Sequence, residues 1–84
     1  MKYLPKLNQL QALLQVARSG SIRSAARELG QSQPALSRTL RELEQILGTQ
    51  LFLRSKEGVA LTEAGIAFLQ RAEWVLEELR RAAD

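Results

Sequence analysis

Apolar residues recur along this chain at intervals of three and four, the spacing that places them on one face of an α-helix. The clearest example is residues 33–47, whose apolar positions are Leu36, Leu40, Leu43 and Leu47. At about 100° per residue they cover a narrow arc, so this helix is expected to bury one face. The opposite face carries short polar and long basic groups: Pro34, Ala35, Arg38, Arg41, Glu42 and Gln45, with Gln33 and Ser37 at its margins.

A shorter helix is predicted just before it, over residues 21–29. Ser21 is suited to cap its first turn, because a hydroxyl accepts a backbone N–H left unpaired there. Ala25 and Ala26 give it a compact apolar face that a neighbouring helix can approach closely.

The two helices are joined by Gly30-Gln31-Ser32. Gly30 suits the left-handed conformation in which helices often end, and Ser32 is the expected cap of the second helix. This is the spacing of a helix-turn-helix, in which the second helix enters the DNA major groove. Taken alone, the second helix could equally be an ordinary amphipathic helix with polar residues outside.

The first helix is expected to be capped by Asn8 and to run to about Ser19. Its apolar positions step by three and four and are Leu7, Leu10, Leu14 and Ala17, flanked by Leu13 and Val16. This helix is interpreted as core scaffold.

Residues 51–54 and 59–61 are predicted to form two short strands around the turn 55–58. Gly58 would supply a positive φ in the turn, and Leu51 and Leu53 are expected to point toward the helices. A functional interpretation puts Arg54, Ser55 and Lys56 at a DNA backbone. The alternative is a plain solvated hairpin, and the pattern alone does not decide between the two.

The last helix is expected to start at the cap Thr62 and to run to the end of the chain. A heptad seam follows it: Gly65, Leu69, Ala72, Leu76, Leu79 and Ala83. A second stripe, Phe68, Val75 and Ala82, lies on an adjacent face. One stripe could be buried in the domain and the other in a partner, which predicts a homodimer; alternatively, both cover the same small core. Trp74 lies near the centre of neither stripe.

The net charge of +3 is unevenly distributed. Residues 1–62 hold nine Lys or Arg and four Asp or Glu, a net +5, whereas residues 63–84 hold three and five, a net −2. The basic part coincides with the helix-turn-helix and the hairpin, which favours a polyanionic partner.

The composition excludes several classes of chemistry. Without Cys or His, the chain forms no disulfide, no thiolate or imidazole metal site, and no Cys- or His-based catalytic site, and no cofactor is expected. Glu42 and Glu44 would face different directions on a helix, and no Gly-rich phosphate loop is present, so an enzyme is not predicted. No apolar run reaches the ~20 residues of a membrane span, and the start lacks a signal-peptide apolar region, so a cytoplasmic location is the default expectation.

RNA binding and partner docking are two alternative binding functions. RNA binding lacks support, because no exposed aromatic residues interleave with the basic ones. A helical module that only dimerises or docks a partner is supported by the heptad seam. It would not need Arg38, Arg41, Arg54 and Lys56 to converge on one side, however.

Four stretches resemble LysR-type transcriptional regulators of bacteria. The most specific is Ser32-Gln33-Pro34-Ala35-Leu36-Ser37-Arg38 followed by Leu43-Glu44, which is similar to the family's recognition helix. Shorter matches are Gly20-Ser21 with Ala25-Ala26, Leu47-Gly48 with Leu51-Phe52 and Arg54, and Leu61-Thr62-Glu63-Ala64-Gly65. They cover essentially all 84 residues, in order.

The resemblance implies a mainly α fold, a winged helix-turn-helix with a short β-hairpin wing and a long C-terminal linker helix. It implies DNA binding as a symmetric dimer, in which Gln33, Pro34 and Arg38 approach bases and Arg54 reaches the minor groove or its phosphates. Arg41 joins the base-reading set from its place on the exposed helix face. Expected backbone contacts are Ser21, Arg23, Ser32, Ser37, Arg54, Ser55 and Lys56. Glu57 departs from the family, many of whose members carry Arg or Lys there.

The expected division is a DNA-binding domain at 1–61 and a linker and dimerisation helix at 62–84, with Leu69, Ala72, Leu76, Leu79 and Ala83 in the dimer contact. The expected partners are double-stranded DNA with an inverted-repeat site and a second copy of the chain. Regulators of this family end in an effector-binding domain. The chain is therefore expected to be an N-terminal part, with any small-molecule effector bound by the missing C-terminal domain.

Overall fold

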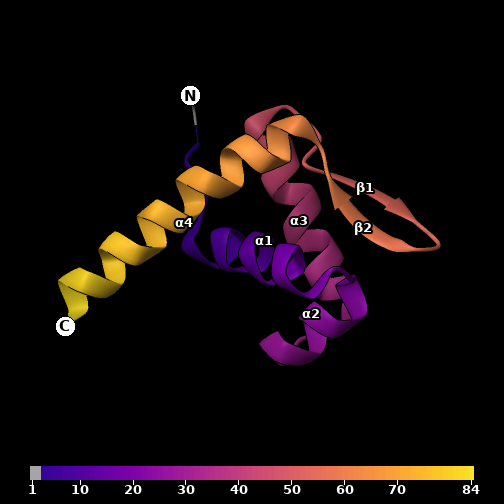
Figure 1. Ribbon diagram of the computed structural model, residues 1–84, viewed down its shortest axis with the longest axis horizontal. Helices are drawn as coiled ribbons and strands as arrows, with labels where there is room; N and C mark the ends of the chain where they lie inside the picture. Colours follow the sequence, from indigo (N-terminus) through magenta and orange to yellow (C-terminus); the bar gives the residue numbers. More distant parts are fainter. Residues whose placement is uncertain (1–2) are drawn as a thin grey trace.

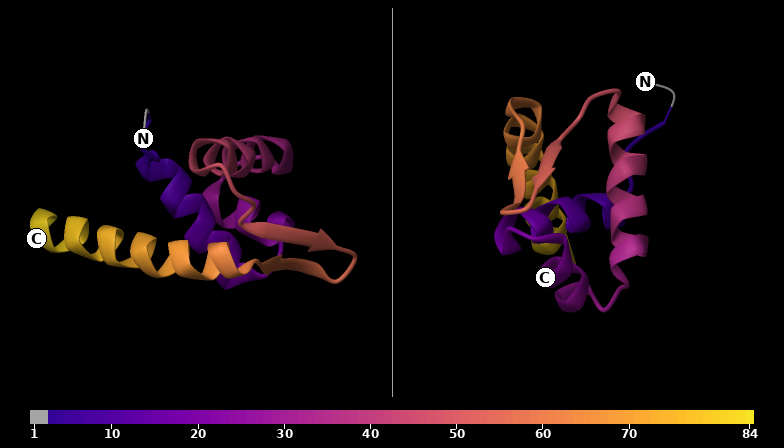
Figure 2. Two further views of the ribbon diagram at one scale, coloured as in Figure 1. Left: turned by 90° about the horizontal axis from the view of Figure 1, so that it is seen from above. Right: turned by 90° about the vertical axis from the view of Figure 1, so that its right-hand side faces the viewer.

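The computed structural model describes residues 3–84; Met1 and Lys2, which fall in the predicted domain 1–61, lie outside the described residues (Figure 1). The chain forms α1 (Leu7–Ser19), α2 (Ile22–Leu29), α3 (Gln33–Leu47), β1 (Phe52–Ser55), β2 (Gly58–Leu61) and α4 (Glu63–Ala83). Helix α1 lies centrally and packs against α2, α3 and α4. The hairpin and the free end of α4 point to opposite ends of the molecule (Figures 1 and 2). This is the predicted mainly α winged helix-turn-helix.

Helix ends that were predicted from capping residues are confirmed. The hydroxyl of Ser21 accepts the backbone N–H of Ser24 at 3.1 Å, and that of Ser32 accepts the N–H of Ala35 at 3.2 Å. The Thr62 hydroxyl accepts the N–H of Gly65 at 2.9 Å and thereby caps α4. These bonds pair amides that the first turn of a helix leaves without partners, and each cap contributes about 1 kcal/mol.

The predicted start of α1 is wrong. The helix is capped at Lys6, and Asn8 lies exposed within its first turn. Instead of an Asn side chain, the buried side chain of Gln9 accepts the Lys6 backbone N–H at 2.8 Å. This bond is one half of a capping box, in which the side chain at the third helical position reaches back to the N–H of the capping residue.

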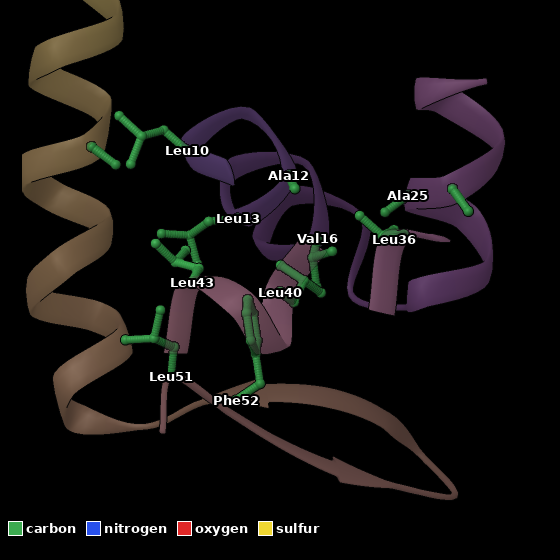
Figure 3. Packing of buried hydrophobic residues seen from close by; sticks show 12 residues of the cluster. Leu10, Ala12, Leu13, Val16, Ala25, Leu36, Leu40, Leu43, Leu51 and Phe52 are labelled. Carbon is green, nitrogen blue, oxygen red and sulfur yellow. The ribbon is translucent and has the colours of Figure 1, made fainter. Parts of the chain in front are cut away.

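The β1–β2 hairpin is called the wing below. A single apolar core joins the helices to the start of this wing (Figure 3). The stripe predicted on α3 is confirmed, since Leu36, Leu40 and Leu43 have no exposed surface and Leu47 is partly buried. Each fully buried leucine contributes about 1.5–3 kcal/mol relative to an exposed one. Among residues 3–84, the buried hydrophobic core is Leu10, Ala12, Leu13, Val16, Ala25, Ala26, Leu36, Leu40, Leu43, Leu51, Phe52 and Ala72.

On α1 the predicted stripe is confirmed at Leu10, which is buried in the core, but its centre is wrong. Leu13 and Val16, expected at its flanks, are fully buried, whereas Leu7 is exposed and Leu14 only half-buried. Leu7 and Leu14 instead line a groove between α1 and the C-terminal half of α4. The helix is apolar on two adjacent faces, and its own periodicity does not show which face meets the core.

The strands pair antiparallel, with Phe52 opposite Leu61 and Ser55 opposite Gly58. The prediction that Leu53 points toward the helices is wrong, because Leu53 is 56% exposed and Phe52 is buried. Leu51 is buried as predicted, but it precedes the strand, so the alternation of side chains starts one residue later.

Candidate nucleic-acid interface

Helix α3 presents a polar face directly opposite its buried leucines. Gln33, Pro34, Arg38 and Arg41, the residues predicted to read bases, are all exposed. With Leu36 and Leu40 fixed in the core, the direction of this face is set by the packing of α3 on the rest of the domain. Arg and Gln side chains held on such a face suit the base edges of a major groove, because they form bidentate hydrogen bonds with guanine and adenine.

The turn between α2 and α3 is tight. Gly30 has a φ of 67°, and the N–H of Gln31 donates to the carbonyl of Ala26 at 2.9 Å. Residues with a side chain rarely adopt this φ, which explains a glycine here. The turn brings α2 against α3, the arrangement of a helix-turn-helix (Figure 2).

The serines predicted to meet the DNA backbone have a second role in the free protein. The hydroxyl oxygens of Ser21 and Ser32 accept helix-capping bonds, and that of Ser55 accepts the Glu57 N–H at 3.3 Å. Each of these hydroxyls keeps its own hydrogen, which is free to be donated to a phosphate oxygen. Arg23 is exposed on the first turn of α2, close in sequence to Ser21.

Hydrogen bonds connect the wing to α3 at two positions along β1. At its base, the Glu44 carboxylate accepts the N–H groups of Leu51 and Phe52 at 2.7 and 3.2 Å. Farther along β1, the Arg54 guanidinium lies 3.4 Å from the Ser37 hydroxyl and donates to it. Two predicted DNA-contacting residues, one from each element, therefore lie side by side.

The turn of the wing is also anchored. The Val59 N–H donates to the carbonyl of Gly20, between α1 and α2, at 3.2 Å. Gly58 has a φ of 126°, as predicted, and a Cβ there would lie 2.7 Å from the Gly20 oxygen. The exposed Lys56 and Glu57 are thus held on a turn that contacts the body of the domain.

The cations of this surface form no ion pair with a carboxylate of residues 3–84. Over residues 3–84, the ion pairs join Arg80 to Glu77 and Arg81 to Glu78, both on α4. The hydrogen bond from Arg80 lowers the pKa of Glu77, and the same bond raises the pKa of Arg80. Arg38, Arg41, Arg54 and Lys56 have no such carboxylate partner in the described residues, so their charge faces solvent.

The predicted dimerisation residues on α4 fall into two groups, some buried in their own domain and some exposed. Ala72 is 1% exposed and belongs to the core of its own domain, so its assignment to a dimer contact is wrong for this structure. Leu69 and Leu76 pack partly against the same core, whereas Leu79 is 49% exposed and Ala83 is exposed. The helix also exposes Ile66, Trp74 and Val75.

Two contacts that shape this site are not predictable from local sequence. Glu44 was part of the family resemblance, but nothing local showed that its carboxylate holds the wing. A Cβ at Gly65 would lie 2.2 Å from the Leu51 carbonyl oxygen, so the start of α4 approaches the wing base too closely for any side chain. Both contacts join residues far apart in sequence.

Within residues 3–84, no helix is long and apolar enough to cross a membrane, and no acidic cluster suits a metal ion.

Residues 7–66 match the model of the bacterial regulatory helix-turn-helix proteins of the lysR family. The chain is 44% identical over 81 residues to the HTH-type transcriptional regulator TdcA of Escherichia coli K12 and 47% identical over 73 residues to the small neutral protease regulatory protein of Streptomyces coelicolor. These matches cover 96% and 87% of this chain but 26% and 23% of the relatives. The chain thus spans about a quarter of the length of these curated relatives.

Solved structures give the same result. The DNA-binding domain of CbnR in complex with DNA has a TM-score of 0.90 and 40% identity, and the match covers 94% of this chain and 91% of that one. The DNA-binding domain of BenM, in complex with catB site 1 DNA, has a TM-score of 0.89 and 33% identity, with 93% and 88% covered.

Proposed function

Because the chain belongs to the lysR family of bacterial regulatory helix-turn-helix proteins, we propose that it binds double-stranded DNA sequence-specifically, as a homodimer, to regulate transcription. The observation that carries this proposal is the joining of the two DNA-facing elements. The exposed face of α3 and the cationic wing meet at the Ser37–Arg54 contact and form one surface with unpaired positive charge.

In the proposed complex, the first turns of α3 enter the major groove. Arg38 and Arg41 pair with guanine, Gln33 pairs with adenine, and Pro34 packs on base edges. The backbone is held by Ser21, Arg23, Ser32 and Ser37, which fix the register of the helix without reading sequence. Arg54, Ser55 and Lys56 of the wing contact the adjacent minor groove or its phosphates.

Dimerisation is proposed through α4, so that residues 1–61 read DNA and residues 62–84 link two such domains. Support comes from the exposed apolar residues of α4 and from a groove of about 510 Å³ between α1 and α4, lined by Leu7, Leu14, Leu76, Leu79 and Ala83 among others. A two-fold dimer requires an inverted-repeat site with half-sites about one or two helical turns apart.

Selection from a pool of randomised duplexes, at near-physiological salt, tests this function. We expect enrichment of a two-fold symmetric sequence. Absence of enrichment, with binding that vanishes as salt rises, would leave only charge attraction and favour the partner-docking module.

Arg38→Ala is expected to weaken binding to the enriched duplex by about 1–3 kcal/mol and to relax selectivity at one base pair of each half-site. The reason is the loss of a bidentate contact to a base edge. Repeating the selection with the variant measures both effects. An equal loss on every duplex, with unchanged selectivity, would contradict a base-reading role.

Lys56→Ala is expected to weaken binding about equally on specific and random duplexes, because a phosphate contact is independent of sequence. The slope of log K against log salt should fall in magnitude by about 1. Titrations at several salt concentrations measure it. An unchanged slope would remove Lys56 from the interface.

A further inference from the structure

We infer that Glu44 is a positioning residue for DNA binding: it sets where the wing lies relative to α3 and so places Arg54, although it does not touch DNA itself. This inference rests on the proposed function and deepens it. It starts from one carboxylate oxygen, Oε2, which accepts both the Leu51 and the Phe52 N–H, at 2.7 and 3.2 Å. Hydrogen bonds to an ionised acceptor are stronger than neutral ones.

The segment that Glu44 holds is a junction of three elements. The Leu51 carbonyl accepts the Thr62 N–H at 3.0 Å, and the Gln50 carbonyl accepts the Thr62 hydroxyl at 2.7 Å. These bonds fix the segment to the start of α4. The Glu44 carboxylate fixes it to α3, and the buried Leu51 and Phe52 side chains fix it to the core. The direction in which β1 leaves the domain is therefore set beside Glu44.

Helix and strand run alongside each other from this point. Ser37 lies seven residues before Glu44, close to two full helical turns, so both are on one side of α3, about 10 Å apart along its axis. On β1, Arg54 follows Phe52 and Leu51 by two and three residues, a distance of roughly 7–10 Å. The matching lengths explain why Arg54 meets Ser37 when Glu44 holds the strand base. A shift at the base would be carried along the strand to Arg54.

Charge alone predicts that removing the Glu44 carboxylate strengthens DNA binding. A carboxylate near a DNA-facing helix repels phosphates, so its removal should strengthen binding. If Glu44 works by placing the wing, its removal should weaken binding instead. The sign of the change separates the two roles.

Glu44→Ala is expected to weaken binding to the duplex enriched by selection roughly tenfold, as the loss of a wing contact would. Glu44→Gln, whose amide oxygen can still accept both N–H groups, should recover most of the affinity. Glu42→Ala is the matched control, because Glu42 is exposed on the same helix and its loss changes charge equally. That variant should bind as well as the wild type or better.

A double-mutant cycle identifies the residue through which Glu44 acts. In an Arg54→Ala background, Glu44→Ala should cost little further affinity, since the contact it places is already gone. Footprints should show lost protection at the bases flanking each half-site and unchanged protection within it. Additive losses, or stronger binding by Glu44→Ala, would overturn the inference.

Hydrogen exchange without DNA gives an independent measurement. Glu44→Ala should speed exchange at the Leu51 and Phe52 amides and along residues 52–61, while α1 and α3 stay protected, which also shows that the variant folds. If the wild type enriches no duplex, the proposed function fails; unchanged exchange at Leu51 and Phe52 would overturn the positioning role separately.

Discussion

Replacing Gly65 by alanine is expected to lower the free energy of unfolding by about 3 kcal/mol and Tm by roughly 10–20 °C. A Cβ at this position would lie 2.2 Å from the Leu51 carbonyl oxygen and 3.1 Å from a methyl carbon of Leu61. The oxygen cannot move aside easily, since Leu51 is buried and its carbonyl also accepts the Thr62 N–H. Helix α4 would have to lift from the wing base. Thermal and denaturant unfolding, followed by circular dichroism, measure the loss.

Intrinsic helix preference predicts the opposite change in stability, namely that alanine at position 65 raises Tm. The sign of the measured change therefore distinguishes the two effects. Alanine is favoured over glycine by about 1 kcal/mol inside a helix. The control Ala67→Gly, at an exposed position of the same helix, should therefore cost about 1 kcal/mol. A Gly65→Ala variant with a higher Tm than the wild type would show that α4 and Leu51 are not in close contact.

Leu79→Glu is expected to dissociate the proposed dimer and to reduce affinity for the symmetric duplex at least ~100-fold. Leu79 is 49% exposed within one chain, so a charge there is compatible with folding but not with a buried dimer contact. Once the dimer is lost, binding to the second half-site becomes a separate event. Light scattering and DNA titration on the same samples link the two losses.

Gln70→Glu is the matched control. Gln70 is exposed and lies nine residues before Leu79, which places it on about the opposite side of α4 with the same added charge. It should remain dimeric and bind nearly as the wild type does. Both variants should bind an isolated half-site equally, and a dimeric Leu79→Glu variant would remove this part of α4 from the proposed contact.

The parts of the fold predictable from sequence are those that depend on neighbours in the chain. Ser21, Ser32 and Thr62 cap the helices that follow them, because a capping bond spans only two or three residues. The face of α3 was predictable because its leucines form a single narrow stripe. For the candidate site, this stripe also determines which side chains remain exposed.

The predictions from sequence were wrong or incomplete where packing by residues of other elements decides which side chain is buried or in contact. Helix α1 has two apolar faces, and only the positions of α3 and α4 decide that Leu13 rather than Leu7 is buried. Ala72 belongs to a heptad seam, and such a seam can pack on its own domain as well as on a partner chain. Gly65 and Glu44 act on Leu51, which is 14 residues from one and seven from the other, and no spacing rule connects them.

Helix α4 is anchored over its N-terminal two thirds, and only its last turns project. Its first turns are clamped by Thr62 and by the contact at Gly65, whereas residues 78–84 are exposed and project from the body of the domain (Figure 1). Leu69, Ala72 and Leu76 also pack on the core, so the projecting part of α4 is residues 77–84, about 12 Å long at 1.5 Å per residue. Whatever α4 joins beyond Leu76 is therefore attached through about two helical turns, which continue the direction of a segment packed on the domain. The same core that orients α3 thus also orients the connection to the rest of the assembly.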